Sequence, residues 1–553
     1  MKIKQIIVAA FIFLFTFSID SFANGNKGEG SPRIINIINF IRNTDYRVEN
    51  SENLLFETVQ KQIELVNKYD FPATFLFQYD ALIVPRYQDL MRTQLNQDKC
   101  EIGAWWEITQ PHVEAAGIKW RGEYSWVSTA NIAFTPGYTQ PERKKLVDVY
   151  MEKFKEIYGR YPKSVGSWYI DSYTLQYMYE KYGIVASCNC KDQVGTDGYT
   201  LWGGYWNQAY YPSKKNAYMP AQTKQGQIPV PIFRMLGSDP IYQYDTGVGT
   251  DYQGVISLEP VYNESGKNKK WVEYFLESIV SGPSLAFNYA QAGQENSFTW
   301  NEMSEGLEMQ FPIFEALRKE GKIRLETLEQ SGMWFKKQFS VTPATAITTM
   351  KDIRNEGNKS VWYNSRYYRT NLYWEKDAFC FRDIHLFNER FQSQYFETPG
   401  TGNQFFYYTL PLVDRYYWST PEDKIGLRFI KIDNDKSDIV LGSPIVTEIA
   451  KDILQVKSTD ENGNIFTITL HENKIDISCN KPELIWALEL KVPSERIERL
   501  PFHTFTKSSI DGTFRGFDYK IQCKEGSIDK GNNDDYIFRL IPSSKNKLVV
   551  DCR

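Results

Sequence analysis

The sequence has little histidine, little cysteine and no strong excess of either charge. Among 553 residues there are four His and seven Cys, and 64 Lys and Arg stand against 68 Asp and Glu, for a formal net charge of −4. So few scattered cysteines do not make the dense framework of a disulfide-stabilised scaffold. A near-neutral balance offers no basic footprint for nucleic acid or for anionic lipid. We therefore expect neither of these as a partner.

Several catalytic motifs are missing as well. No HxxxH or HExxH pair occurs, and His112 is the only histidine before residue 345, so a zinc site of clustered imidazoles is not indicated. His112 follows a proline and is interpreted as a loop or supporting residue. A serine hydrolase would need a GxSxG elbow, and nucleotide chemistry a glycine-rich phosphate loop, and neither is present. We expect no metal and no cofactor.

The first 23 residues have the pattern of a secretory signal peptide. Two lysines precede an apolar run over residues 6–17, and Ser21-Phe22-Ala23 forms a small-x-small cleavage site. The apolar run is shorter than the ~20 residues of a membrane-spanning helix. We expect the mature chain to be secreted or periplasmic, with no membrane contact after signal cleavage.

From Arg33 to about residue 335, short apolar runs alternate with amphipathic helices. Residues 34–40 (IINIINF) and 73–77 (ATFLF) have the pattern of buried strands, and between them Leu55, Val59, Ile63 and Val66 recur at helical spacing. Further strand candidates end near Trp106, Ile170, Ser187, Met235 and Asn288. About seven strands of this kind, with no GxGxxG loop after the first, favour a parallel barrel over an open doubly wound sheet.

After about residue 345 the pattern becomes that of an all-β module. Residues 453–456, 465–470 and 475–478 are short strands separated by turn signals, and 536–551 has the pattern of a terminal strand pair. The fold class we predict is α/β, a distorted parallel (β/α) barrel over 24–345 followed by an all-β sandwich over 346–553. The ring-rich segment 362–374 either packs the two domains together, which we favour, or borders a cleft.

In a parallel barrel the reactive groups lie where strands end and loops begin. Here those positions are mostly acidic: Asp45, Asp80, Glu107, Asp171, Asp192, Asp197, Asp239 and Glu295. Carboxylates that converge on one rim repel one another, which raises one pKa and leaves another low. Hydrolysis of a glycosidic bond needs such a pair and no cofactor, so this chemistry survives the exclusions above.

Two segments resemble the glycoside hydrolase/polysaccharide deacetylase superfamily, whose fold is a seven-stranded β/α barrel: EIGAWWE at 101–107 and VGSWYIDSYTLQYMYEKYGI at 165–184. The whole chain also resembles a secreted, two-domain, glycoside-hydrolase-like family of Bacteroides-type bacteria, described mainly as domains of unknown function. The W-x-I-D strand end is similar to that of retaining α-mannosidases, and this resemblance implies Asp171 as the nucleophile. Asn43-Thr44-Asp45 stands where those enzymes have H-x-D, so the zinc-binding pattern is not matched.

The sequence therefore predicts a secreted glycoside hydrolase that acts on a poly- or oligosaccharide through a carboxylate pair, with retention of configuration. Asp171 is the expected nucleophile, Glu295 the general acid/base and Glu107 its substitute. The expected substrate-binding residues are Asp45, Asp80, Trp106, Asp192, Arg234 and Asp239.

Some of these residues have plain structural interpretations too. Asp171 is placed to cap the helix that follows it, and Arg234 to form an ion pair with Asp239. Of the neighbours Trp105 and Trp106, at most one faces the barrel interior. The alternative function is a non-catalytic glycan-binding protein on a degenerate barrel, and a deacetylase with an unusual metal site is a third, weaker one.

Overall fold

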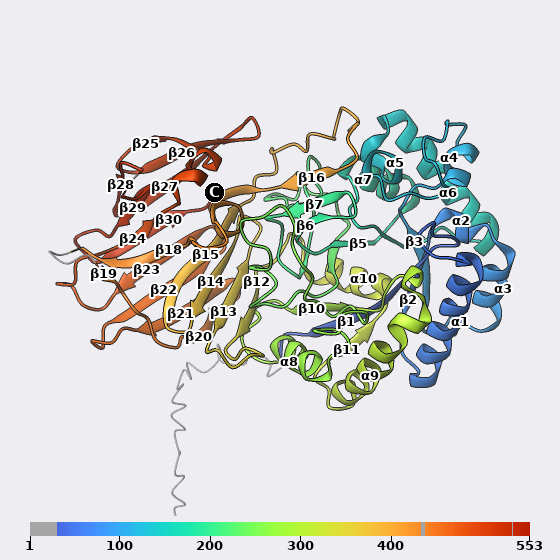
Figure 1. The fold of residues 1–553 in the computed structure, drawn as a ribbon, viewed down its shortest axis with the longest axis horizontal. Helices are drawn as coiled ribbons and strands as arrows, with labels where there is room; N and C mark the ends of the chain where they lie inside the picture. Colours follow the sequence, from blue (N-terminus) through green and yellow to red (C-terminus); the bar gives the residue numbers. More distant parts are fainter. Residues whose placement is uncertain (1–29, 433–436, 534) are drawn as a thin grey trace, which may run out of the picture.

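The structure is a computed structural model and describes residues 30–432, 437–533 and 535–553 (Figure 1). The signal peptide expected over residues 1–23 lies outside the described residues. A helix-rich part coloured blue to yellow-green lies beside a β-rich part coloured ochre to red (Figure 1). Within the described residues, none of the helices has the length and apolar character needed to cross a bilayer.

The first part is built on a nine-stranded sheet with the order β10-β1-β2-β3-β4-β5-β9-β8, in which β11 also pairs with β1. Its strands are β1 (Arg33–Ile41), β2 (Thr74–Phe77), β3 (Glu101–Trp105), β4 (Ser164–Gly166), β5 (Ala186–Cys190), β8 (Ala209–Tyr210), β9 (Ile232–Met235), β10 (Asn288–Ala292) and β11 (Arg324–Glu326). All pair in parallel except β8 with β9. The ring of Phe233 on β9 packs against Tyr289 on β10 at 4.9 Å, which brings the two ends of the sheet together. The expected parallel, barrel-like sheet is thus confirmed.

Helices cover the outside of this sheet (Figure 1). The longer ones are α1 (Ser51–Tyr69), α3 (Pro85–Thr93), α6 (Gln140–Tyr158), α7 (Ser172–Tyr182), α8 (Lys269–Val280), α9 (Thr299–Lys319) and α10 (Leu328–Gln338), with short turns at α2 (Tyr79–Leu82), α4 (Gln110–Ala115) and α5 (Ala130–Ala133). The predicted stripe Leu55, Val59, Ile63 and Val66 is the buried face of α1. Helix α6 begins with a capping box in which Glu142 accepts from the backbone N–H of Thr139 at 2.8 Å.

Side chains on the two faces of each barrel strand enter different layers. Trp105 lies inside, stacked on Phe40 with ring centroids 4.2 Å apart, whereas Trp106 packs on the helix side against His112 and Tyr150. One of the neighbouring tryptophans therefore faces the interior, as strand alternation requires. The Nε2–H of His112 donates to the carbonyl of Leu146 at 2.8 Å, and burial lowers the pKa of His112 to about 4, so it is a core histidine.

Three of the predicted strand ends are shifted. Strand β4 stops at Gly166, well before Ile170, while β5 and β10 extend beyond Ser187 and Asn288 to Cys190 and Ala292. The segment after β4 is a buried loop, in which Trp168 and Ile170 are 8% and 1% exposed. An apolar run in a buried loop has the same pattern as a buried strand, so the sequence could not separate them.

The second part consists of two antiparallel sheets that form the expected sandwich. The ten-stranded sheet has the order β12-β13-β14-β15-β18-β24-β29-β28, with β17 on β15 and β19 on β18. Its strands are β12 (Thr345–Thr349), β13 (Lys359–Asn364), β14 (Tyr368–Glu375), β15 (Ala378–Leu386), β17 (Leu410–Asp414), β18 (Leu427–Lys431), β19 (Ser437–Asp438), β24 (Trp486–Leu490), β28 (Ser527–Lys530) and β29 (Phe538–Ile541).

The eight-stranded sheet has the order β20-β21-β22-β23-β30-β27-β26-β25. Its strands are β20 (Ile445–Ala450), β21 (Ile453–Thr459), β22 (Ile465–His471), β23 (Lys474–Cys479), β25 (Phe502–Phe505), β26 (Ser509–Phe514), β27 (Phe517–Glu525) and β30 (Lys547–Asp551). The strand pair predicted over 536–551 is wrong in one respect: β29 and β30 exist, but they belong to different sheets. The link between them crosses the sandwich, because each strand finds its partners elsewhere in the chain.

The two parts are joined by shared structure. Strand β16 (Phe405–Tyr408) pairs in parallel with β7 (Tyr199–Trp202), which pairs with β6 (Gln193–Thr196), so one small sheet takes strands from both parts. Trp362 of the ring-rich segment stacks on Trp206 of the first part, with centroids 3.8 Å apart and an interplanar angle of 1°. The segment 362–374 therefore packs the two parts together, the use that we favoured.

Candidate active site at the barrel mouth

A buried arginine gathers three carboxylates at the carboxyl ends of the barrel strands. Arg42 directly follows β1, and its guanidinium donates to the two oxygens of Glu107 at 2.9 and 2.7 Å. The same guanidinium lies 2.9 Å from Glu295 and 3.4 Å from Asp45. The exposed fractions of these acidic side chains are 0% for Glu107 and Asp45 and 7% for Glu295. Three acids predicted from separate βα units are thus brought together.

Local backbone contacts hold this arrangement in place. The side chain of Asn296 accepts from the backbone N–H of Arg42 at 2.9 Å and donates to its carbonyl at 2.8 Å. Gly293 has φ 90°, and a Cβ there would lie 2.2 Å from the carbonyl oxygen of Ile38. Only glycine lets the loop after β10 approach β1 this closely. As a result the backbone of Glu295, two residues further on, forms an isolated parallel β-bridge with Phe40, and its carboxylate faces Arg42.

The electrostatic environment shifts the pKa values of Glu295 and Asp45 in opposite directions. Burial raises the pKa of Glu295 to about 7; Arg42 opposes this rise and the charge of Glu107 adds to it. Burial would raise the pKa of Asp45 too, yet that pKa lies below its ordinary value because Arg47 and Arg42 stabilise the charged form. The guanidinium of Arg47 donates hydrogen bonds to both carboxylate oxygens of Asp45, at 2.9 and 2.8 Å. Below about pH 7 these two carboxyls on one guanidinium therefore favour opposite protonation states.

Asp80 adds a fourth carboxyl to this end of the barrel. It lies on α2 just after β2, where burial raises its pKa to about 7, against hydrogen bonds from the backbone of Ala81 and Asn43, while the charge of Glu107 adds to the rise. Its Oδ2 is buried and has no hydrogen-bond partner among the described residues. Gln78, also after β2, donates to Glu107 at 2.8 Å. The second strand thus contributes both an acid and a donor to the cluster.

Arg42 and a neighbouring group formed by Lys191 and Glu259 were not predicted from the sequence. The ammonium of Lys191 lies 3.9 Å from Glu259, which accepts from Gln294 at 2.9 Å. Gln294 in turn accepts from the backbone N–H of Glu295 at 2.8 Å. Arg42 and Lys191 each follow a strand directly, so their position alone could have marked them as candidates. Glu259 lies in a long loop, and nothing in its sequence surroundings marks it.

Aromatic side chains cover the cluster and extend to the surface. The ring of Trp126 lies 4.0 Å from the guanidinium carbon of Arg42. Beside it, Tyr46 and Tyr124 stack with centroids 4.8 Å apart at 3°, and they are 44% and 47% exposed. Exposed ring faces are typical of sites that receive the apolar face of a sugar.

Asp171 lies outside this cluster. It is the N-cap of α7, where one oxygen accepts from the backbone N–H of Thr174 at 2.9 Å and from Arg143 at 3.0 Å. The other oxygen accepts from the hydroxyls of Thr135 and Thr174 at 2.6 and 2.7 Å. Each oxygen thus has two donors, and no contact links Asp171 to Arg42 in the described ranges. The arrangement is that of the helix cap, the structural alternative to the nucleophile.

Trp106 does not offer a ring to substrate. It is 1% exposed, its ring centroid lies 5.4 Å from His112 and 5.7 Å from Tyr150, and its indole N–H points to Thr135 at 3.4 Å. A sugar would need an open ring face. The expectation that Trp106 binds substrate is therefore corrected: the residue belongs to the packing between β3 and the helices.

The remaining expected binding residues are buried inside the molecule. Asp192 pairs with Arg234 at 2.9 Å and with Arg369 of β14, so both barrel residues face the β-rich part. Asp239 accepts from two backbone N–H groups and from the indole of Trp271 at 2.9 Å. Asp192, Arg234 and Asp239 are 2%, 1% and 0% exposed. Arg234 is thus paired with Asp192 and not with Asp239. Asp192 links the two parts through Arg369, whereas the partners of Asp239 lie in the first part.

A metal centre does not fit the residues at the mouth. In the part of the chain that the structure describes, no three or more His, Cys, Asp or Glu side chains are grouped as metal ligands. The acids that do converge share a guanidinium, whose fixed charge stands where a divalent cation would have to bind. Asn43 supplies a carboxamide in place of the imidazole that zinc prefers.

No family profile matches the chain, and no curated protein does either. Among solved structures, a protein of Parabacteroides distasonis described as a glycoside hydrolase/deacetylase is similar with a TM-score of 0.50 and 14% identity, over 71% of this chain and 89% of that chain. Polysaccharide deacetylases of Mycobacterium smegmatis and Pseudomonas aeruginosa give TM-scores of 0.35 and 0.34 at 12% and 10% identity, each over 56% of this chain and 92% or 93% of theirs. The first similarity establishes the fold alone, and it agrees with the barrel that the sequence resemblance implies.

Proposed function

We propose that this chain is an exported carbohydrate-active enzyme, a glycoside hydrolase whose acid/base is Glu295 and whose second carboxylate is Glu107. The observation that carries the proposal is their shared guanidinium: Arg42 lies 2.9 Å from Glu295 and donates twice to Glu107, and the charge of Glu107 helps to raise the pKa of Glu295 to about 7. A protonated carboxyl beside an ionised one is the pair that glycoside hydrolysis requires. The protein with the similar fold, described as a glycoside hydrolase/deacetylase, supports the substrate class.

Each residue has a definite task in the proposed reaction. Glu295 gives its proton to the glycosidic oxygen as the bond to the anomeric carbon breaks, and Glu107 attacks that carbon to form a glycosyl ester. Water then attacks the ester, Glu295 takes the proton, and Glu107 leaves as a carboxylate. Arg42 positions both acids. Glu107 replaces Asp171 as the nucleophile, because each oxygen of Asp171 already accepts two hydrogen bonds, from Thr174 of α7, Arg143 and Thr135.

Substrate must reach a pair that is 0% and 7% exposed. Trp126 covers Arg42, and the exposed rings of Tyr46 and Tyr124 continue from it to the surface. We expect a sugar to stack on these rings and to displace Trp126, which exposes Glu295. Displacement of water from the site strengthens the electrostatic pairing that remains.

The test is turnover by matched glutamate variants. Purified wild-type protein is screened against plant and host glycans for reducing-sugar release, and Glu295→Gln and Glu107→Gln are compared on any glycan that is cleaved. Loss of acid/base catalysis typically costs about 10²–10⁴-fold in rate. Glu305→Gln, an exposed glutamate on α9, is the control and should retain full activity. A product of retained configuration by NMR supports Glu107 as nucleophile, and full activity of Glu295→Gln contradicts the proposal.

A second function is favoured by one specific observation. The acids at the mouth are neutralised by Arg42 and Arg47 and almost completely buried, which suits a barrel that binds glycan without cleaving it. In that case wild-type protein binds a glycan of the panel but releases no sugar, and Glu295→Gln binds it equally well. Tyr124→Ala should weaken the binding under either function, because both use the exposed rings.

A further inference from the structure

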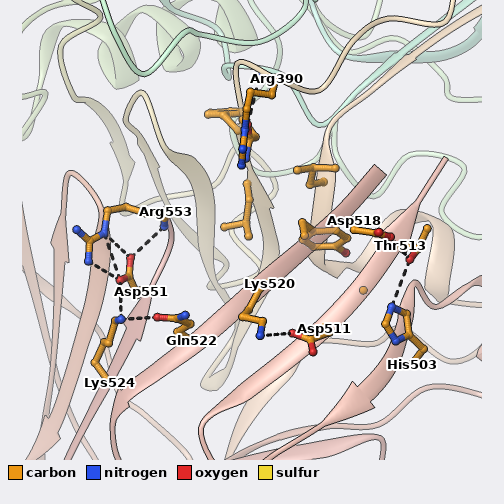
Figure 2. Close-up of a pocket in the computed structure, with 16 residues that line it drawn as sticks. Arg390, His503, Asp511, Thr513, Asp518, Lys520, Gln522, Lys524, Asp551 and Arg553 are labelled. Carbon is orange, nitrogen blue, oxygen red and sulfur yellow. Dashed lines mark hydrogen bonds and ion pairs between the residues drawn. The ribbon is translucent and has the colours of Figure 1, made fainter. Parts of the chain in front are cut away.

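The β-rich part holds a large open cavity whose lining includes none of the residues of the cluster at the barrel mouth. Its volume is about 940 Å³, and it lies between the outer side chains of β26 and β27, the end of β30 and the loop that follows β15. This volume is large enough for a small oligosaccharide. Figure 2 shows Arg390 entering from one side, opposite Lys520 and Asp511 on the strands. We propose that this cavity is a second saccharide-binding site, specific for a sugar acid such as a uronate.

The charge pattern of the lining points to a carboxylate ligand. Two of its cations share one acid, because Asp551 lies 2.6 Å from Arg553 and 3.5 Å from Lys524. Lys520 is paired with Asp511 at 3.1 Å. Asp518 accepts from the hydroxyl of Thr513 at 2.6 Å, at the end of the cavity where His503 also lies (Figure 2).

Arg390 is the cation without an acidic partner. Its side chain reaches only Asn388, at 3.5 Å, among the contacts that the structure describes, and it is exposed. A guanidinium presents two parallel N–H groups that match a carboxylate, and this bidentate pairing is stronger than a hydrogen bond to a neutral hydroxyl. An arginine that projects into a cavity unpaired is therefore the element that selects the charged sugar.

The rest of the lining suits the body of a sugar. Leu386, Leu410 and Tyr519 form an apolar part, and Gln522 and Thr513 add neutral hydrogen-bonding groups at the rim. Sugars have one face of C–H groups and an edge of hydroxyls, so a mixed lining of this kind is complementary to them. Tyr519 donates to the carbonyl of Pro411 at 2.5 Å, which ties β27 to β17 of the other sheet and holds this side of the cavity rigid.

This second site rests on the proposed function only in taking the ligand to be a saccharide; it needs no catalysis at the mouth. Binding is therefore measured by titration calorimetry on Glu295→Gln, with trisaccharides of galacturonate, glucuronate and mannuronate and with their methyl esters as neutral matches. We expect the acids to bind at least about tenfold more tightly than the esters, and added salt to weaken binding.

Arg390→Gln tests the assigned residue. It should weaken acid binding about tenfold or more and leave ester binding unchanged, whereas Arg160→Gln, an exposed arginine on the barrel, should change neither. Absence of binding by every acid, equal binding of acids and esters, or unchanged binding in Arg390→Gln overturns the proposal. So does a glutamate tripeptide that binds as tightly as the sugar acids, because the cavity then recognises charge without the sugar. Loss of uronate binding in Arg390→Gln, together with no glycan cleavage by wild-type protein, would reject the proposed function and support this site.

Discussion

Arg42 shows why acids can converge on a barrel mouth without destabilising it. Three buried carboxylates would repel one another strongly in a medium of low dielectric constant. One guanidinium within 3.4 Å of all three replaces this repulsion with attraction. The same contacts restrict the access of substrate, because the acids that the guanidinium holds are nearly closed to solvent. In the proposed reaction, substrate must therefore replace contacts that the folded chain makes by itself.

Glu101 lies at the opposite end of β3 from the mouth. The effect of its buried carboxyl on stability can therefore be measured apart from the cluster at the mouth. Burial raises its pKa to about 7, although Ser164, Thr74 and the backbone of Glu329 donate to it. The folded state thus holds a proton that the unfolded state releases near pH 4.5. The stabilising contribution of that proton is complete below pH 4.5 and is lost as the pH rises to about 7.

We predict that Glu101→Gln removes this part of the pH dependence. The variant carries no titrating group there, so its free energy of unfolding minus that of wild-type protein should increase by about 3 kcal/mol from pH 4.5 to about pH 7. Urea unfolding at several pH values measures the difference, and contributions from Asp80 and Glu295 cancel in it. For Glu308→Gln, on the exposed face of α9, the difference should stay constant. A constant difference for Glu101→Gln as well would contradict the prediction.

Single residues were predictable from sequence where strand ends were clear. Glu107 and Glu295 follow apolar strands, so their position at one rim followed from the parallel topology. The partner of an ion pair does not follow in this way. Arg42 stands next to β1, but its link to Glu107 spans 65 positions in sequence and depends on how the sheet curves. Asp192 and Arg234 also lie near the ends of barrel strands, yet they face the junction between the two parts.

At the scale of elements, α7 shows how one pattern serves two interpretations. An Asp before an amphipathic helix is a frequent N-cap, and the same Asp after a barrel strand is a frequent catalytic group. Here β4 ends at Gly166, so Asp171 follows a buried loop and reaches Thr174 and Arg143. The strand end was predicted near Ile170, which made Asp171 the residue directly after the strand, whereas four loop residues separate it from β4. Helix α1 was predicted well because its apolar stripe is a local pattern.

We predict that Asp171→Ala destabilises the protein more than it affects the chemistry. It removes the cap of α7 and leaves Arg143, 1% exposed, without its counter-charge. A broken buried ion pair costs about 3–5 kcal/mol, and a lost cap about 1 kcal/mol. Thermal unfolding should show a clearly lower Tm, and turnover per folded molecule should persist. Adding Arg143→Met should recover part of the stability. Abolished turnover at an unchanged Tm would restore Asp171 as the nucleophile.

At the scale of the whole molecule, the two parts are joined by a buried ionic network as well as by packed rings. Arg369 of β14 pairs with Asp192 of the barrel and, at 2.8 Å, with Asp383 of β15. All three side chains are 0–1% exposed, and Arg234 completes the set. The sequence indicated two modules and their order. It did not indicate this coupling, because charges far apart in sequence give no periodic signal.

Arg369→Met should therefore weaken the connection between the parts. It leaves Asp192 and Asp383 buried with fewer counter-charges, and breaking a buried pair costs about 3–5 kcal/mol. Because Arg369 links both parts, we expect calorimetry to show a lower Tm and a transition that separates into two, one for each part. The control is Arg539→Met on β29: Arg539 is 7% exposed and donates to Glu489 of β24 at 2.6 Å, inside the β-rich part, so its loss should lower the Tm and leave one transition. A single transition at the wild-type Tm in Arg369→Met would show that Trp206, Trp362 and the shared sheet hold the parts together without the network.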